Sequence, residues 1–277
     1  MYLNVTQSCQ PMVRAARAME NTRQTFRHPV SRITQWRRKL ADRLVRKLGH
    51  TPRVVNAQGA RFLVDTTDYI DQCIAWESIW DGPQLNRLAA VSLAAQPIGY
   101  FIDVGSNSGF YSVMFATRNL ASRIVAFEPD PGNYARLLSN LTLNGLCPRV
   151  DARRLALGDV ESDVSLYEGA MWNRGESSIA LPDQTPKLVT HLVQQARFDS
   201  LFALSDERII IKIDVEGYEF EAIAGMEQTL RRNACYVQVE LYSERLHELQ
   251  HLLAGLGYSF VHTEAIDYFF TNMSEIG

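Results

Sequence analysis

The 277-residue chain contains no apolar run near the roughly 20 residues that a membrane-spanning helix needs. No apolar segment follows Met1, so the pattern of a secretory signal is missing as well. The cysteines are few and have neither metal-binding nor redox spacing, which favours free thiols in a reducing compartment (Cys9, Cys73, Cys147 and Cys235). Hydrophobic residues make up 46% of the chain, enough for a packed core. We therefore expect a folded cytoplasmic protein.

Acidic residues are scarce at the start of the chain. Residues 1–53 hold twelve Lys or Arg but only two acidic residues, Glu20 and Asp42, which gives them a net charge of +10. Since the whole chain has a formal net charge of −3, the remaining residues carry −13. This asymmetry predicts a basic extension, 1–53, ahead of one domain, 54–277. Within the extension, apolar residues recur at helical spacing over residues 31–48 and predict a basic amphipathic helix (Ile33, Trp36, Leu40, Leu44 and Leu48).

Three interpretations of that helix stay open. Its apolar stripe could pack on the domain, or its charges could bind an acidic partner or an anionic membrane surface, placing the protein at the inner face of a membrane. The Arg-rich, acid-poor composition also fits a cleaved transit peptide. The arginines lack the aromatic interleaving of a nucleic-acid platform, so no nucleic-acid partner is expected.

After residue 53, apolar strand patterns alternate with helical ones, which predicts a mostly parallel sheet with helices on both faces. The expected strands are 61–65, 100–104, 123–128, 151–157, 208–214, 235–241, 258–262 and 267–272. The expected helices are 84–95, 110–118, 131–143, 218–231 and 244–254. The last two strands leave no room for a helix between them, so they must form an antiparallel hairpin. The polar interval 159–200 is too long for a simple crossover and predicts a functional insertion.

A dinucleotide fingerprint is also missing. The stretch FIDVGSNSGFY, residues 101–111, has the form D-x-G-x-N-x-G and lacks the third glycine that cradles a pyrophosphate. Asp103 at the strand end suits a cationic ligand better than a phosphate. Glu128, at the end of the next strand, is placed to accept both hydroxyls of a ribose. S-adenosylmethionine carries an ammonium, a sulfonium and a ribose, and so fits this loop.

The order of motifs resembles the FkbM family of methyltransferases over about residues 61 to 241. The matching stretches are FIDVGSNSGFYS, AFEPDPGNYARLLSNLTLNG, ALGD, NRGESSI, IIIKIDVEGYEFEAIAGM and VQVEL. The loop departs modestly from the family pattern at Ser106-Asn107, where the family often has Ala or Ala-Asn. The resemblance implies a Rossmann-like class I fold, α/β, with a seven-stranded, mostly parallel sheet ending in an antiparallel hairpin. It also implies O-methylation of a sugar, glycan, or polyketide- or peptide-type natural product.

The cofactor site that follows from these motifs comprises Asp103, Gly105, Ser106, Asn107, Gly109, Tyr111, Glu128, Pro129 and Asp159. By similarity, Asp159 or its neighbours would meet the adenine edge, although a turn-forming Gly-Asp without a ligand role explains this stretch almost as well. The acceptor wall would come from the insertion, where an aromatic face adjoins hydrogen-bonding groups (Trp172, Asn173, Arg174, Ser177 and Ser178).

Four charged residues are the candidates for catalysis. Lys212 and Asp214 share one strand face, Glu216 follows, and Glu240 ends the neighbouring strand. A carboxylate here could take the acceptor's proton, with Lys212 orienting it. Asp214 and Glu240 could instead hold a divalent cation that acidifies the hydroxyl. A purely structural charge network is the third interpretation.

HELQH, residues 247–251, fits the zinc-protease pattern, but no third ligand is placed convincingly, so no zinc site is expected. DVEG after the fourth strand differs from the Asn/Asp-Pro-Pro-aromatic turn of N-methyltransferases. The alternative to an enzyme is a non-catalytic binding or scaffold module that keeps this fold. The sequence leaves the oligomeric state open, and a homo-oligomer is compatible with it.

Overall fold

The computed structural model describes residues 52–77, 80–167, 179 and 189–276. The amphipathic helix expected over 31–48 and the acceptor residues expected between 172 and 178 lie outside the described residues. Among the helices that are described, none is both long and apolar enough to cross a membrane.

The central feature of residues 50–277 is a seven-stranded sheet with the order β11-β12-β10-β9-β3-β4-β5. β3, β4, β5, β9 and β10 run parallel, whereas β12 pairs antiparallel with both β10 and β11. The predicted terminal hairpin and mostly parallel sheet are therefore confirmed. The strands are β3 (Tyr100–Val104), β4 (Arg123–Phe127), β5 (Val150–Arg153), β9 (Arg208–Ile213), β10 (Ala234–Glu240), β11 (Ser259–Glu264) and β12 (Asp267–Thr271).

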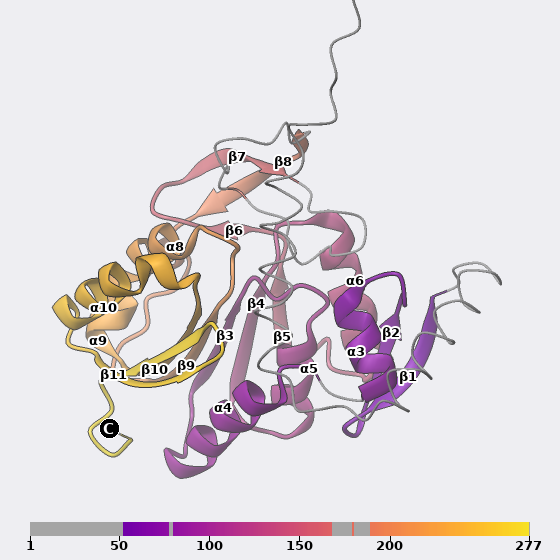
Figure 1. The fold of residues 1–277 in the computed structure, drawn as a ribbon, viewed down its shortest axis with the longest axis horizontal. Helices are drawn as coiled ribbons and strands as arrows, with labels where there is room; N and C mark the ends of the chain where they lie inside the picture. The colour runs from indigo at the N-terminus through magenta and orange to yellow at the C-terminus, as the bar shows by residue number, and fades with distance from the viewer. Residues whose placement is uncertain (1–51, 78–79, 168–178, 180–188, 277) are drawn as a thin grey trace, which may run out of the picture. The chain divides into compact units, whose positions relative to one another are not determined.

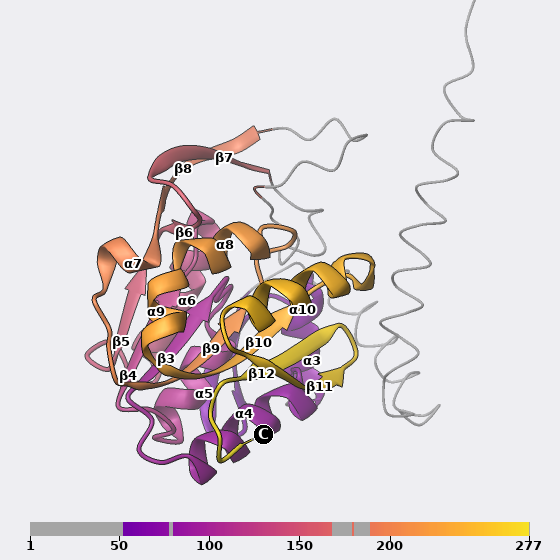
Figure 2. The same cartoon turned by 90° about the vertical axis from the view of Figure 1, so that its left-hand side faces the viewer.

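Helices cover both faces of this sheet (Figures 1 and 2). Side chains alternate along the central strands, so Phe101 and Ile210 pack in the core under the first helix layer, while Ile102 and Ile211 pack under the second. Burial on both faces explains why these strands read as unbroken apolar runs. The first layer is α4 (Gly82–Ala94), α5 (Phe110–Thr117) and α6 (Pro131–Leu143); the second is α8 (Glu219–Gly225), α9 (Glu227–Arg232) and α10 (Leu246–Gly255).

The strand expected at 61–65 does not join the main sheet. It is β2 (Ala60–Val64), which forms a separate hairpin with β1 (Arg53–Ala57), and α3 (Tyr69–Glu77) follows it. The hairpin is tied to α6, since the Leu63 N–H donates to Asn140 Oδ1 at 2.7 Å. α3 is tied to α6 by an ion pair between Asp71 and Arg136. Burial raises the pKa of Asp71 to about 7, against the opposing effect of Arg136.

The prediction of one continuous strand over residues 151–157 is wrong. Leu155 N donates to the carbonyl of Arg153 and turns the chain, so β5 ends and a two-residue strand, β6 (Ala156–Leu157), leaves for another sheet. There β6 pairs with β8 (Val189–Ala196), which pairs with β7 (Ser162–Tyr167). The interval 159–200 thus carries strands of its own. The helix expected over 218–231 is likewise divided at Met226.

Two glycines join the three-stranded sheet to α8. A Cβ on Gly225 would lie 2.0 Å from the carbonyl oxygen of Gly158. We expect Gly225→Ala to lower the free energy of unfolding by about 1–3 kcal/mol, because backbone on both sides must move. Gly255→Ala is the matched control, since Gly255 also ends a helix but its added Cβ meets nothing within 4 Å. Urea titrations of both variants check this, and equal effects would contradict the expected close contact.

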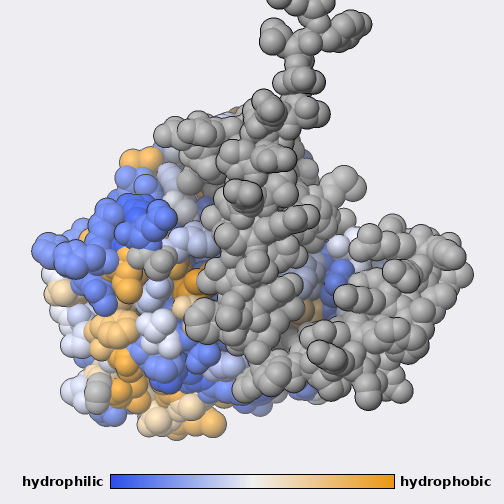
Figure 3. All heavy atoms as spheres, in the orientation of Figure 1, coloured by the Kyte–Doolittle hydropathy of each residue, from blue (hydrophilic) through white to orange (hydrophobic). Residues whose placement is uncertain are grey.

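The surface shown in Figure 3 has hydrophobic residues gathered at the lower left, the side on which Figure 1 places β10, β11 and α4. Phe260 of β11 and Leu93 of α4 are among the exposed large hydrophobic side chains. Apolar atoms also make up much of the surface of monomeric proteins, so this gathering does not by itself indicate an interface. The homo-oligomer therefore stays a prediction.

Candidate active site

A row of polar side chains crosses three central strands near their carboxyl ends. Asp103 of β3 lies opposite Lys212 of β9, and Lys212 lies opposite Gln238 of β10. All three are buried and continue the strand face that carries Phe101 and Ile210. Open α/β sheets bind ligands at this edge of the sheet.

Lys212 is the cation of this row. Its Nζ donates to Asp214 Oδ2 at 2.8 Å and lies 4.9 Å from the centre of the Tyr111 ring. Burial lowers the pKa of Lys212, but the carboxylates of Asp214 and Asp103 raise it more, so the net pKa is raised. The side chain therefore stays an ammonium. The predicted contact between Lys212 and Asp214 is present.

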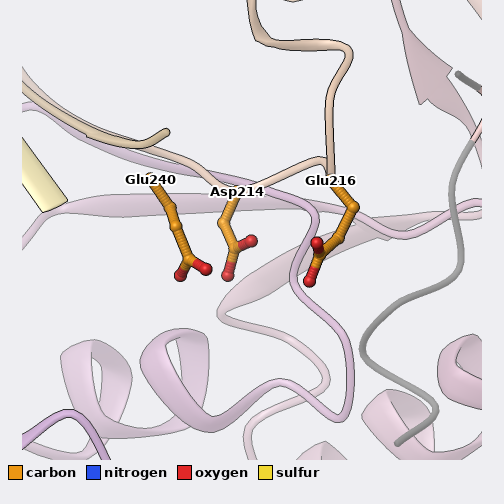
Figure 4. A group of neighbouring side chains, drawn as sticks. All are labelled: Asp214, Glu216 and Glu240. Carbon is orange, nitrogen blue, oxygen red and sulfur yellow. The ribbon is translucent and has the colours of Figure 1, made fainter. Parts of the chain in front are cut away.

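Three partly buried carboxylates surround the ends of β9 and β10. Asp214 and Glu216 follow β9, Glu240 ends β10, and one carboxylate oxygen from each lies within 4.8 Å of the others. Figure 4 shows the three carboxyl groups pointing to the same side. Glu216 reaches this position through a left-handed backbone, with φ of 51°. The four residues proposed for catalysis from the sequence thus lie at one edge.

The glycine loop is held between two strands. The N–H groups of Gly105 and Ser106 both donate to the carbonyl of Phe127 at the end of β4. Gly105 has a φ of 78°, and a Cβ there would lie 1.8 Å from the Asp214 carbonyl oxygen. The loop therefore lies directly against the turn that follows β9 and carries Asp214. Only glycine allows this approach.

Glu128, directly after β4, binds the glycine loop through its side chain. Its two carboxylate oxygens accept the N–H groups of Asn107 at 2.7 Å and Asp130 at 3.0 Å. Burial raises the pKa of Glu128 to about 8, although both N–H groups oppose the rise. Each oxygen keeps a lone pair beyond the one that these bonds use. Pro129 follows, half-buried, and Asp130 caps α6.

Asp103 lies at the floor of the loop. Its Oδ2 accepts from Ser112 Oγ at 2.6 Å, while its buried Oδ1 has no hydrogen-bond partner among the described residues. Burial raises the pKa of Asp103, and Lys212 and Ser112 counter the rise. Buried carboxylate oxygens rarely lack a donor, and a ligand that donates to Asp103 would satisfy this one.

Asp159 is not part of this row. It follows β6 of the three-stranded sheet and is exposed, and its carbonyl accepts from Arg197. Its contact with adenine stays a prediction. Among the described residues, the group that could hold a metal ion is Asp214, Glu216 and Glu240. His247 and His251 of α10 are exposed and do not belong to it.

Four further polar residues of the site were missed from the sequence. Gln238 and Gln84 donate to the two oxygens of Asp267 at 2.7 and 2.9 Å, and Tyr111 Oη donates to Asp81 at 3.4 Å. Burial, with the Asp267 carboxylate adding to it, raises the pKa of Asp81 to about 8. Burial raises the pKa of Asp267 to about 6. Gln238 could have been found, since VQVEL puts it on the same face as Glu240.

Comparison with known families decides the class of this site. The family described as "Methyltransferase FkbM domain" matches residues 103–273. The chain belongs to the FkbM methyltransferase family.

Two curated methyltransferases, from two organisms, are similar to this chain. The 2-O-methyltransferase NoeI of Sinorhizobium fredii is 25% identical over 174 residues, covering 58% of this chain and 70% of NoeI. The hexuronic acid methyltransferase AglP of Haloferax volcanii is 27% identical over 145 residues, covering 51% of this chain and 55% of AglP. The crystal structure of an FkbM methyltransferase from Methylobacillus flagellatus aligns over 74% of this chain and 54% of that chain, with 15% identity and a TM-score of 0.45.

The cofactor of this fold is S-adenosylmethionine, and the residues present fit it. Asp103 offers a buried carboxylate oxygen that has no partner in the described part of the chain, and Glu128 offers acceptors directly after β4. Gly105 and Gly109, both at positive φ, let the loop turn in a conformation that other residues rarely adopt. Asp103, the loop and Glu128 would hold it. The share of each residue in binding stays a prediction.

The raised pKa of Glu128 has a consequence for cofactor affinity. The ionised Glu128 carboxylate can accept hydrogen bonds from the ribose hydroxyls. The protonated acid instead presents one O–H donor, so it accepts fewer of them. With a pKa of about 8, the ionised fraction rises about tenfold between pH 7 and pH 9. We expect calorimetry to show affinity for S-adenosylhomocysteine rising by up to tenfold over this range. In Glu128→Gln the affinity should be lower and lose this slope; an unchanged slope would contradict the assignment.

Proposed function

We propose that the protein transfers a methyl group from S-adenosylmethionine to a hydroxyl of a sugar, a glycan, or a polyketide- or peptide-type natural product. The observation that carries this proposal is the group of three partly exposed carboxylates beside Lys212, at the sheet edge next to the cofactor loop. The similarity to NoeI, a 2-O-methyltransferase, and to AglP, a hexuronic acid methyltransferase, supports an oxygen acceptor on a sugar.

The chemistry assigns a role to each charged group. The bound cofactor supplies a methyl group that is already activated, so holding the acceptor in line provides much of the catalysis. An alcohol must also lose its proton, and a carboxylate within hydrogen-bonding distance can accept it. Asp214 is our first candidate for this base, because it is partly exposed and Lys212 fixes its Oδ2. Glu216 and Glu240 would orient the acceptor.

A metal-assisted form of the same step uses the same three residues. Carboxylate oxygens are the ligands that Mg²⁺ prefers, and the three here lie close enough to share one ion. A cation at this place would lower the pKa of the acceptor hydroxyl. Dialysis against EDTA followed by Mg²⁺ addition tests this form: activity that falls and returns would support it, and unchanged activity would favour the direct base.

The test of the function has two stages. Calorimetry with S-adenosylhomocysteine comes first, because lack of binding would favour a non-catalytic scaffold. A transfer screen with methyl-labelled S-adenosylmethionine follows, over neutral sugars, uronic acids, amino sugars and polyketide aglycones. We expect an alkali-stable methyl ether as the product.

Two other products would contradict the proposal. A hexuronic acid offers a carboxyl as well as hydroxyls, and methylation of the carboxyl gives an ester that alkali hydrolyses. Transfer to the nitrogen of an amino sugar, with none to the same sugar bearing only hydroxyls, would indicate an N-methyltransferase.

A further inference from the structure

Asp81 stands immediately before α4, where an aspartate normally accepts the first N–H groups of the helix. Its carboxylate makes no such cap, and its backbone is left-handed with φ of 45°. Non-glycine residues occupy this region at a cost, and they persist there when the surrounding structure requires it. Asp81 thus gives up its usual helix-capping role in an unfavourable conformation.

The carboxylate is directed to Tyr111 instead. Tyr111 Oη donates to Asp81 Oδ2 at 3.4 Å, and the Tyr111 side chain is buried in α5. The ring of Tyr111 faces the Lys212 ammonium at 4.9 Å, and that ammonium contacts Asp214 at 2.8 Å. A continuous chain of contacts therefore leads from α4 to the proposed base.

The turn that carries Asp81 is itself fixed. Gln84, one turn later in α4, donates to Asp267 at 2.9 Å, and Asp267 pairs with Glu240 across β12 and β10. Gln84 and Asp267 are both buried. The start of α4 is thereby attached to β12, which lies beside β10, the strand that ends in the proposed active-site residue Glu240. Asp81 and Gln84 precede residue 103, where the family match begins.

We propose that Asp81 is a positioning residue that acts through Tyr111: its carboxylate holds the Tyr111 ring against Lys212, and the ring keeps the ammonium in contact with Asp214. The value of this arrangement for methyl transfer rests on the proposed function. The contact itself can be tested without any acceptor, so a failed acceptor screen and a failed positioning test are distinguishable.

Lysine NMR provides that test, because the chain has four lysines, Lys39, Lys47, Lys187 and Lys212. In full-length protein with the first three replaced by arginine, selective ¹³Cε-lysine labelling leaves one signal. The ring current of Tyr111 should move the ε-proton signal of Lys212 upfield. Tyr111→Leu removes the ring and gives the unshifted position.

Asp81→Gly removes the carboxylate that accepts from Tyr111, so we expect loss of most of the upfield shift. Glycine also suits the left-handed backbone at this position, so the variant should fold. Tyr111→Phe keeps the ring but removes the donor, and should give the same loss even if Asp81→Gly does not fold. Asp81→Asn retains an acceptor oxygen and should restore the shift. Asp163→Asn, a change at an exposed carboxylate of β7, should leave it unchanged. An unshifted signal in the starting protein would overturn the proposal, and so would an upfield signal retained in Tyr111→Phe.

Discussion

Asp214→Asn should lower kcat for methyl transfer by about 10²- to 10⁴-fold, the usual contribution of a positioned general base. The amide has the shape of the carboxylate and keeps an oxygen for Lys212 Nζ, which donates to Asp214 at 2.8 Å. Asp103 and Glu240 also stay near the buried ammonium, so it is not left without an opposite charge. The loss should therefore appear in the chemical step. Initial rates with labelled cofactor and the acceptor found by screening measure it.

Binding of S-adenosylhomocysteine separates this effect from damage to the fold. Its affinity should change little in Asp214→Asn, because the N–H groups of the glycine loop donate to the Phe127 carbonyl and to the Glu128 carboxylate. Asp151→Asn is the matched control, since this carboxylate is 48% exposed and belongs to the edge strand β5. Unchanged turnover in Asp214→Asn would remove Asp214 from the mechanism and leave Glu216 or Glu240 as the base.

Of the glycine substitutions proposed, Gly105→Ala should lower the free energy of unfolding most. A non-glycine residue at positive φ costs about 1–2 kcal/mol, and the overlap of the new Cβ with the Asp214 carbonyl adds about 1–3 kcal/mol. The free energy of unfolding should fall by about 2–5 kcal/mol. Because the loop and the turn after β9 must separate to make room, cofactor affinity should fall as well. Urea titration and calorimetry measure the two effects.

Gly145→Ala isolates the backbone part of that loss. Gly145 has a φ of 67°, and a Cβ added there would meet nothing within 4 Å. It should lose only the first 1–2 kcal/mol and bind S-adenosylhomocysteine normally. Similar losses in both variants would contradict the expected overlap between the loop and Asp214.

The central sheet was predictable because its signals are local. The apolar runs at 100–104 and 208–214 lie within about one residue of β3 and β9, and the short gap before 267 required a hairpin. The same holds for Lys212 and Asp214, since residues two apart on a strand share a face. The strand expected at 151–157 failed because its continuous pattern hid a turn at Arg153, after which the chain pairs with β8 instead of β4.

The sequence alone determined the class of fold, the position of the glycine loop after β3 and the charged residues at the end of β9, because each depends on spacing within a short stretch. Only the tertiary structure could add Asp81 and Gln84. Gln84 and Asp267 are 183 residues apart, and neither stretch contains a sign of the other. Their meeting depends on how α4 packs on the sheet and on β12 entering between β10 and β11. These are long-range arrangements that no local pattern encodes.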